Sequence, residues 1–202
     1  MRKYELTEET KTLADGTVLH RIRAVKDFAL ADGTEVLAGD LGGWIEKEYN
    51  LSHGGYAWVY GDARVYGDAR VYGDAEVYGD AKVCGDARVY GDARVYGYAW
   101  VYGYARVCGD AKVCGYAEVC GYAEVKIIRD YAVFKNGWSS GRWFTYTRSD
   151  RKWKVGCFHG TGEELIAKAY EDSELSGKCY ETIVRAQEAI DKAIEAEKGE
   201  TK

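Results

Sequence analysis

Between Gly55 and Lys126 the alternation of apolar and polar residues repeats every six positions. Each of the twelve units has the form Gly–(Asp or Tyr)–Ala–X–Val–(Tyr, Cys or Lys). Within a unit, the small and branched apolar residues alternate with polar or aromatic ones, which is the period of a strand with one buried face. Glycine and aspartate tolerate left-handed backbone conformations and therefore favour sharp turns. The pattern predicts short strands joined by two-residue corners.

The identical units also predict how these strands are arranged. Every unit has the same direction and the same inward residues, so the strands are not expected to form hairpins. A coiled chain satisfies them, because each strand then pairs in parallel with the strand one full coil away. A helix is excluded, since a six-residue period would scatter the apolar side chains around its axis.

The unit Val-Tyr-Gly-Asp-Ala-Arg has a branched aliphatic residue followed four positions later by a small one. In this the chain resembles the left-handed parallel β-helix of the hexapeptide-repeat proteins. The resemblance implies a triangular solenoid with about eighteen residues, or three units, in each coil. The flanking segments DLGGWIEKEYNLSHGG and WKVGCFHGTGEEL resemble a group of hexapeptide-repeat proteins from bacterial and prophage genomes.

Four segments are expected along this mainly β chain. An N-terminal β cap at 1–44 precedes the β-helix at 45–134, and a basic, aromatic β-hairpin at 135–160 follows it as a second cap. Residues 161–202 have apolar positions at helical spacing. Thr161 and Glu164 have the spacing of a capping box and predict where the helices begin.

A coil of eighteen residues stacks the outward side chains in columns about 4.8 Å apart. Arg70, Arg88 and Arg106 then share one column, and Tyr72 and Tyr90 lie on the adjacent one. Guanidinium groups bind phosphate or carboxylate, and aromatic rings stack on bases. These five residues, here called the Arg–Tyr face, form the first candidate binding site. The alternatives are a solvated face neutralised by nearby aspartates and a relic of repeat duplication.

The hairpin segment supplies the second candidate binding site. Basic residues interleave there with aromatic ones, among them Arg142, Trp143, Tyr146 and Trp153. Such a surface suits nucleic acid or glycans. The alternative is that the aromatic residues cover the open end of the β-helix, because an exposed sheet edge tends to aggregate.

Composition narrows the classes of partner and of site. A net charge of −5 argues against a protein built as a whole around nucleic acid or anionic membrane. No apolar run suggests secretion or a membrane span, so a cytoplasmic location is expected. The six cysteines lack the close pairing of zinc sites. We expect them to be reduced, without metal, and to replace tyrosine at the surface.

Many hexapeptide-repeat proteins are trimeric acyltransferases that use a histidine base and an acyl-CoA donor. Here the histidines, His20, His53 and His159, lie outside the uninterrupted repeat, so no catalytic residue, metal or cofactor is assigned. The sequence favours a non-enzymatic binding or scaffold protein, and the resemblance implies a phage or prophage accessory protein that engages a host or phage protein. An acyltransferase, and a binder of nucleic acid or another anion through the Arg–Tyr face, are the alternatives. A dimer or trimer stays open.

Overall fold

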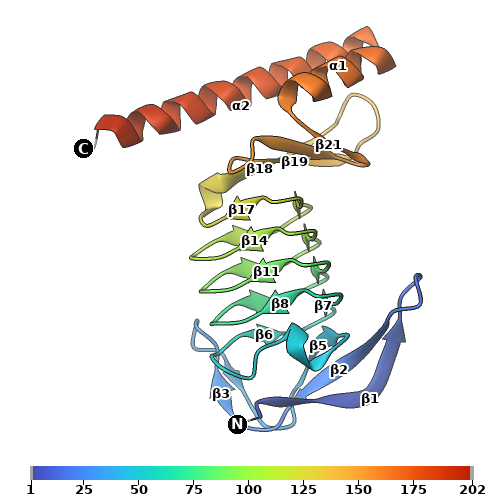
Figure 1. Ribbon diagram of the computed structural model, residues 1–202, viewed down its shortest axis with the longest axis vertical. Helices are drawn as coiled ribbons and strands as arrows, with labels where there is room; N and C mark the ends of the chain where they lie inside the picture. Colours follow the sequence, from blue (N-terminus) through green and yellow to red (C-terminus); the bar gives the residue numbers. More distant parts are fainter. Residues whose placement is uncertain (1, 201–202) are drawn as a thin grey trace.

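A computed structural model describes residues 2–200 of the chain, which form an elongated stack (Figure 1). The N-terminal strands lie at the lower end, a coiled region of short strands forms the middle, and a strand cluster with two helices lies at the upper end. The chain is therefore mainly β, as the sequence predicts. Within the described residues, no helix is long and apolar enough to cross a membrane.

Twelve two-residue strands form the coil. They are arranged in three parallel columns of four, each of which makes one face. The first face holds β6 (Trp58–Val59), β9 (Glu76–Val77), β12 (Arg94–Val95) and β15 (Lys112–Val113). The second face holds β7 (Arg64–Val65), β10 (Lys82–Val83), β13 (Trp100–Val101) and β16 (Glu118–Val119). The third face holds β8 (Arg70–Val71), β11 (Arg88–Val89), β14 (Arg106–Val107) and β17 (Glu124–Val125). Paired residues such as Arg88 and Arg106 lie eighteen positions apart, which confirms the predicted coil length.

The repeated alanines and valines fill the interior of the coil and are at most 1% exposed. Glycine forms the corners because the backbone there is left-handed, with a φ of +67° at Gly67. A Cβ atom at Gly67 would also lie 3.0 Å from the backbone nitrogen of Gly85, one coil above. The corner therefore requires glycine for its conformation and for its close contact with the next coil.

Successive coils are joined by hydrogen bonds of constant direction. The N–H groups point to the upper end, as in the bond from Arg64 N to the Ala81 carbonyl at 2.9 Å. The lowest coil therefore has free carbonyl groups and the highest has free N–H groups, and each end needs partners of the opposite kind. The two caps supply them.

The lower cap provides hydrogen-bond donors. It contains β1 (Tyr4–Thr12), β2 (Val18–Ala24), the pair β3 (Phe28–Ala29) and β4 (Glu35–Val36), β5 (Leu41–Ile45) and a 3₁₀ turn, η1 (Glu48–Asn50). Strand β5 pairs in parallel with β7, so the cap continues one face of the coil. The Lys3 ammonium donates to the Ala57 carbonyl at 2.6 Å, and the Asn50 amide donates to the Ala69 carbonyl at 2.8 Å.

The upper cap provides hydrogen-bond acceptors. After the 3₁₀ turn η2 (Ile128–Asp130), an antiparallel sheet is formed by β18 (Tyr131–Lys135), β19 (Trp143–Thr147), β20 (Lys152–Val155) and β21 (Phe158–Gly160). The predicted hairpin is thus the centre of a four-stranded sheet. Thr145 Oγ1 accepts from the Glu118 N–H at 2.9 Å, and Ser149 Oγ accepts from the Glu124 N–H at 2.7 Å. This segment therefore caps the coil.

Two helices, α1 (Gly162–Asp172) and α2 (Glu174–Glu200), cover the outer side of this sheet (Figure 1). Thr161 and Glu164 form the predicted capping box, in which Glu164 Oε2 accepts from the Thr161 N–H at 2.7 Å. Between the sheet and the helices lies a second apolar core, which includes Phe144, Trp153 and Tyr180. The upper cap is thus stabilised by its own core.

Candidate functional site

The Arg–Tyr face lies on the column of strands β8, β11 and β14. Arg70 pairs with Arg88 and Arg88 with Arg106, so the three side chains stack as the sequence predicts. All three arginines are exposed. Within the described part of the chain, none of them forms an ion pair within 4 Å. Their guanidinium groups therefore remain available to an external anion.

A stack of aromatic rings runs beside the arginines. The rings of Tyr72 and Tyr90 lie 5.0 Å apart and are inclined by 2°. Cys108 occupies the next position of the column and is 6% exposed. A hydrogen bond to its thiol, together with partial burial, raises the pKa of Tyr90 to about 12. Tyr90 is therefore an uncharged hydroxyl donor at neutral pH.

A groove of about 740 Å³ opens at the lower end of this face, where the first coil meets η1. Its lining comprises Glu48, Tyr49, Leu51, Ser52, His53, Arg70, Val71, Tyr72 and Arg88. Arg70, Tyr72 and Arg88 belong to the predicted site. The residues of η1 and of the turn after it were not predicted. The first coil is longer there, since Leu51 pairs with Val71 twenty positions away instead of eighteen. The two extra residues interrupt the period, which is why the repeat pattern alone misses this wall.

His53, in the wall of the groove, is fixed by hydrogen bonds at both ring nitrogens. Its Nδ1 accepts from the backbone N–H of Lys3 at 3.3 Å, so the proton of the neutral ring lies on Nε2, which donates to Glu48 at 3.0 Å. The ring also stacks on Tyr4 with centroids 4.3 Å apart. Bonds from Arg2 and then His53 lower the pKa of Glu48. Neither ring nitrogen is free to act as a base.

The four predicted residues of the upper cap are not brought together on one surface. Trp143 is 38% exposed and stacks on Tyr116 with centroids 5.1 Å apart. Arg142 lines a separate cavity of about 310 Å³ with Lys168 and Tyr180.

Tyr146 and Trp153 are 5% and 2% exposed, so most of each side chain packs in the cap, and both line a further cavity of about 440 Å³ between the sheet and α2. Tyr146 donates from its hydroxyl to Asp191, and burial raises its pKa.

The cysteines depart from the prediction that they replace tyrosine at the surface. All six are free thiols, as expected, but Cys84, Cys108 and Cys120 are at most 8% exposed. Larger neighbours in the same and adjacent columns cover them, and the Trp100 indole donates to the Cys84 sulfur at 3.2 Å. Among the described residues, no group of three potential ligands could hold a metal ion.

Comparison with known proteins supports the architecture. Residues 57–73 and 87–103 match a family model described as the YdcK β-solenoid repeat. Over 67 residues the chain is 40% identical to the protein named uncharacterized acetyltransferase YdcK of Escherichia coli (strain K12). That match covers 30% of this chain but only 19% of the relative. Together with the coil, these matches support a hexapeptide-repeat-like β-helix.

Proposed function

We propose that this chain is a non-enzymatic binding and scaffold protein whose Arg–Tyr face engages another macromolecule. The flanking segments that resemble prophage-encoded hexapeptide-repeat proteins further support a role as a phage or prophage accessory protein with a host macromolecule as its partner. A cytoplasmic location, and a dimer or trimer as the working assembly, belong to the same proposal.

The observation that carries the proposal is the column of three exposed arginines without ion-pair partners among the described residues. Like charges directly opposite each other on neighbouring strands are destabilising. The coil nevertheless holds them in line, beside two stacked tyrosine rings. A partner with carboxylate or phosphate groups would neutralise the column, because guanidinium groups bind both anions through paired hydrogen bonds.

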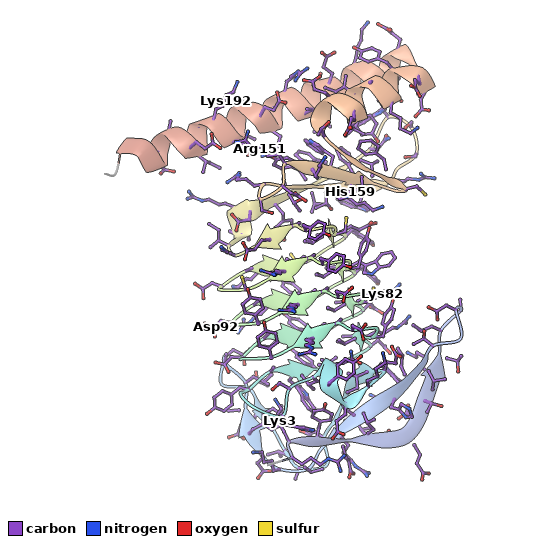
Figure 2. The ribbon with its side chains drawn as sticks, viewed as in Figure 1. Lys3, Lys82, Asp92, Arg151, His159 and Lys192 are labelled. Carbon is purple, nitrogen blue, oxygen red and sulfur yellow. The ribbon has the colours of Figure 1, made fainter. Side chains whose placement is uncertain are left out.

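The histidines argue against the alternative of acyl transfer. Both ring nitrogens of His53 are used within the protein. His159 lies against Gly121 at the upper end (Figure 2), and His20 lies on β2 of the lower cap. His20 and His159 therefore lie in the caps, and His53 has no ring nitrogen free to act as the base that acyl transfer needs. The relative's name includes acetyltransferase, but the shared stretch covers less than a fifth of it.

Affinity capture from a bacterial lysate tests the proposal. We expect wild-type protein to retain a partner that is lost in Arg88→Ala and on raising the salt concentration. Lys112→Ala is the matched control, because it removes the same charge from the same position of the repeat on another face. Equal capture by wild type and Arg88→Ala, or loss only in Trp143→Ala, would contradict the assignment to the Arg–Tyr face.

The enzymatic alternative has its own measurement. Purified protein is incubated with acetyl-CoA and a panel of sugars and amines, and release of free CoA is followed. We expect no release above that of the protein-free control. Turnover that disappears in His53→Gln would refute the non-enzymatic proposal.

A further inference from the structure

The column of tyrosine rings on the Arg–Tyr face lacks one ring at its lower end. The Ser52 N–H donates to the Val71 carbonyl just as the Tyr72 N–H donates to the Val89 carbonyl. Ser52 therefore occupies the position directly below Tyr72 in the column. Its side chain is too short to cover the ring above, so the lower side of the Tyr72 ring borders the groove.

The walls of the groove suit a flat, largely apolar group. Leu51 and Val71 line it with aliphatic carbons, and Tyr49 provides a second aromatic side chain. A volume of about 740 Å³ lies in the range of pockets that hold small organic ligands. A planar ring could enter below Tyr72 and continue the stack, in which neighbouring rings are 5.0 Å apart.

The charges of the groove favour an anion beside that ring. Arg70 and Arg88 both line it and have no carboxylate partner within 4 Å among the described residues. Glu48, the acidic residue of the lining, is already bound by Arg2 at 2.8 Å and by His53 at 3.0 Å. Its negative charge is thus largely compensated, and an incoming anion meets two arginines that form no close ion pair among the described residues.

We infer that this groove binds a planar aromatic ring that carries an anionic group, in the manner of a nucleotide base with its phosphate. The base stacks under Tyr72, in the position that a tyrosine occupies one coil higher, and the phosphate binds Arg70 and Arg88. The inference rests on the proposed function and specifies the chemistry of the partner. The nucleotide is either free or the end of a single strand.

Calorimetric titration with adenosine monophosphate, adenosine and inorganic phosphate tests the site. Because base stacking on an aromatic side chain is worth about 1–3 kcal/mol, we expect the nucleotide to bind at least about fivefold more tightly than phosphate alone. Ser52→Tyr should fill the position and abolish nucleotide binding, whereas Ser52→Ala should retain it. Tyr72→Leu should weaken binding by about fivefold or more. Melting curves confirm that each variant is folded.

Two results would overturn the inference. One is a nucleotide affinity no greater than that of phosphate. The other is unchanged nucleotide binding in both Ser52→Tyr and Tyr72→Leu. If the site is confirmed, a 5′-phosphorylated single-stranded oligonucleotide that competes with the nucleotide supports a strand end as ligand, and one that does not compete supports the free nucleotide.

Arg106 separates this inference from the proposed function, because it lies on the Arg–Tyr face but outside the groove. If Arg106→Ala loses the captured macromolecule while wild type binds no nucleotide, the proposed function stands and the inference fails. If the nucleotide binds and Arg106→Ala captures the macromolecule as well as wild type does, the site stands and the wider role of the face fails.

Discussion

Lys3 lies at the lower end of the coil (Figure 2). Among the described residues it is the lysine that is buried, with 1% of its surface exposed. Its ammonium donates to the carbonyls of Ala57 at 2.6 Å and Gly55 at 3.3 Å, which the lowest coil leaves unpaired. Burial, and then the charge of Lys26, lower its pKa from 10.5 to about 8. We predict that this shift makes the stability of the protein depend on pH.

The sign follows from proton binding. Between pH 8 and 10.5 the unfolded chain holds the Lys3 proton that the folded chain has lost, so the free energy of unfolding rises with pH in that range. One unit of pKa difference corresponds to about 1.4 kcal/mol, so the gain from about pH 7 to about pH 9.5 is about 2 kcal/mol. For a chain of 202 residues this corresponds to about 4–8 °C in the melting midpoint.

Comparison of wild type with Lys3→Met isolates the effect, because every other titrating group is common to both proteins. Burial raises the pKa of the Cys120 thiol, so its contribution to stability is lost as pH rises. This effect opposes that of Lys3 in the wild-type curve, but it is present in both proteins and cancels in their difference. Urea unfolding from about pH 7 to about pH 9.5 should show the variant losing about 2 kcal/mol relative to wild type. If the difference in free energy of unfolding between wild type and Lys3→Met stays constant over this pH range, the lowered pKa of Lys3 and the burial that causes it are refuted.

Three further perturbations test the faces, the upper cap and the corners. Arg88→Gln should raise the free energy of unfolding by a few tenths of a kcal/mol at low salt, because it removes like-charge repulsion, and the gain should vanish at about 1 M salt. Glu124→Gln should lower the free energy of unfolding, because Glu124 places a negative charge opposite Arg106. Thr145→Val should cost about 1–3 kcal/mol in urea unfolding and speed hydrogen exchange at the Glu118 amide, which loses its acceptor; unchanged exchange would argue against this cap contact. Gly85→Ala should cost more than about 1 kcal/mol, because its φ is +65° and its Cβ would lie 3.1 Å from Gly103 N. Gly115→Ala imposes the same backbone strain, but its Cβ would meet open space, so its thermal midpoint should fall less than that of Gly85→Ala. Equal losses of thermal midpoint would show that the contact between neighbouring coils does not contribute to the cost.

The coil could be predicted because each unit specifies the same local structure. Val89 and its equivalents define the interior, and the glycine corners define the turns. Constant spacing then fixes which residues stack, so that Arg70, Arg88 and Arg106 are found in line without any knowledge of the caps.

The caps could not be predicted in the same way, because their decisive contacts are single and far apart in sequence. Lys3 meets Ala57 across 54 positions, and Thr145 meets Glu118 across 27. No repeat period in the sequence predicts either contact. The alternation of basic and aromatic residues around Trp153 also left open whether that side chain faces solvent, and its burial depends on helices that begin at Gly162.

The contrast between coil and caps also explains why the candidate ligand groove lies where it does. A column of identical units gives a closely packed surface, on which each ring, such as Tyr90, is covered by its neighbour. The groove below Tyr72 occurs where this regularity is broken, because Ser52 replaces an aromatic residue and the coil gains two residues near His53. The repeat therefore supplies the charges of Arg70 and Arg88, and the junction with the lower cap supplies the space. Selectivity for one ligand over another is accordingly expected to depend on residues of η1 and the following turn more than on the repeat itself.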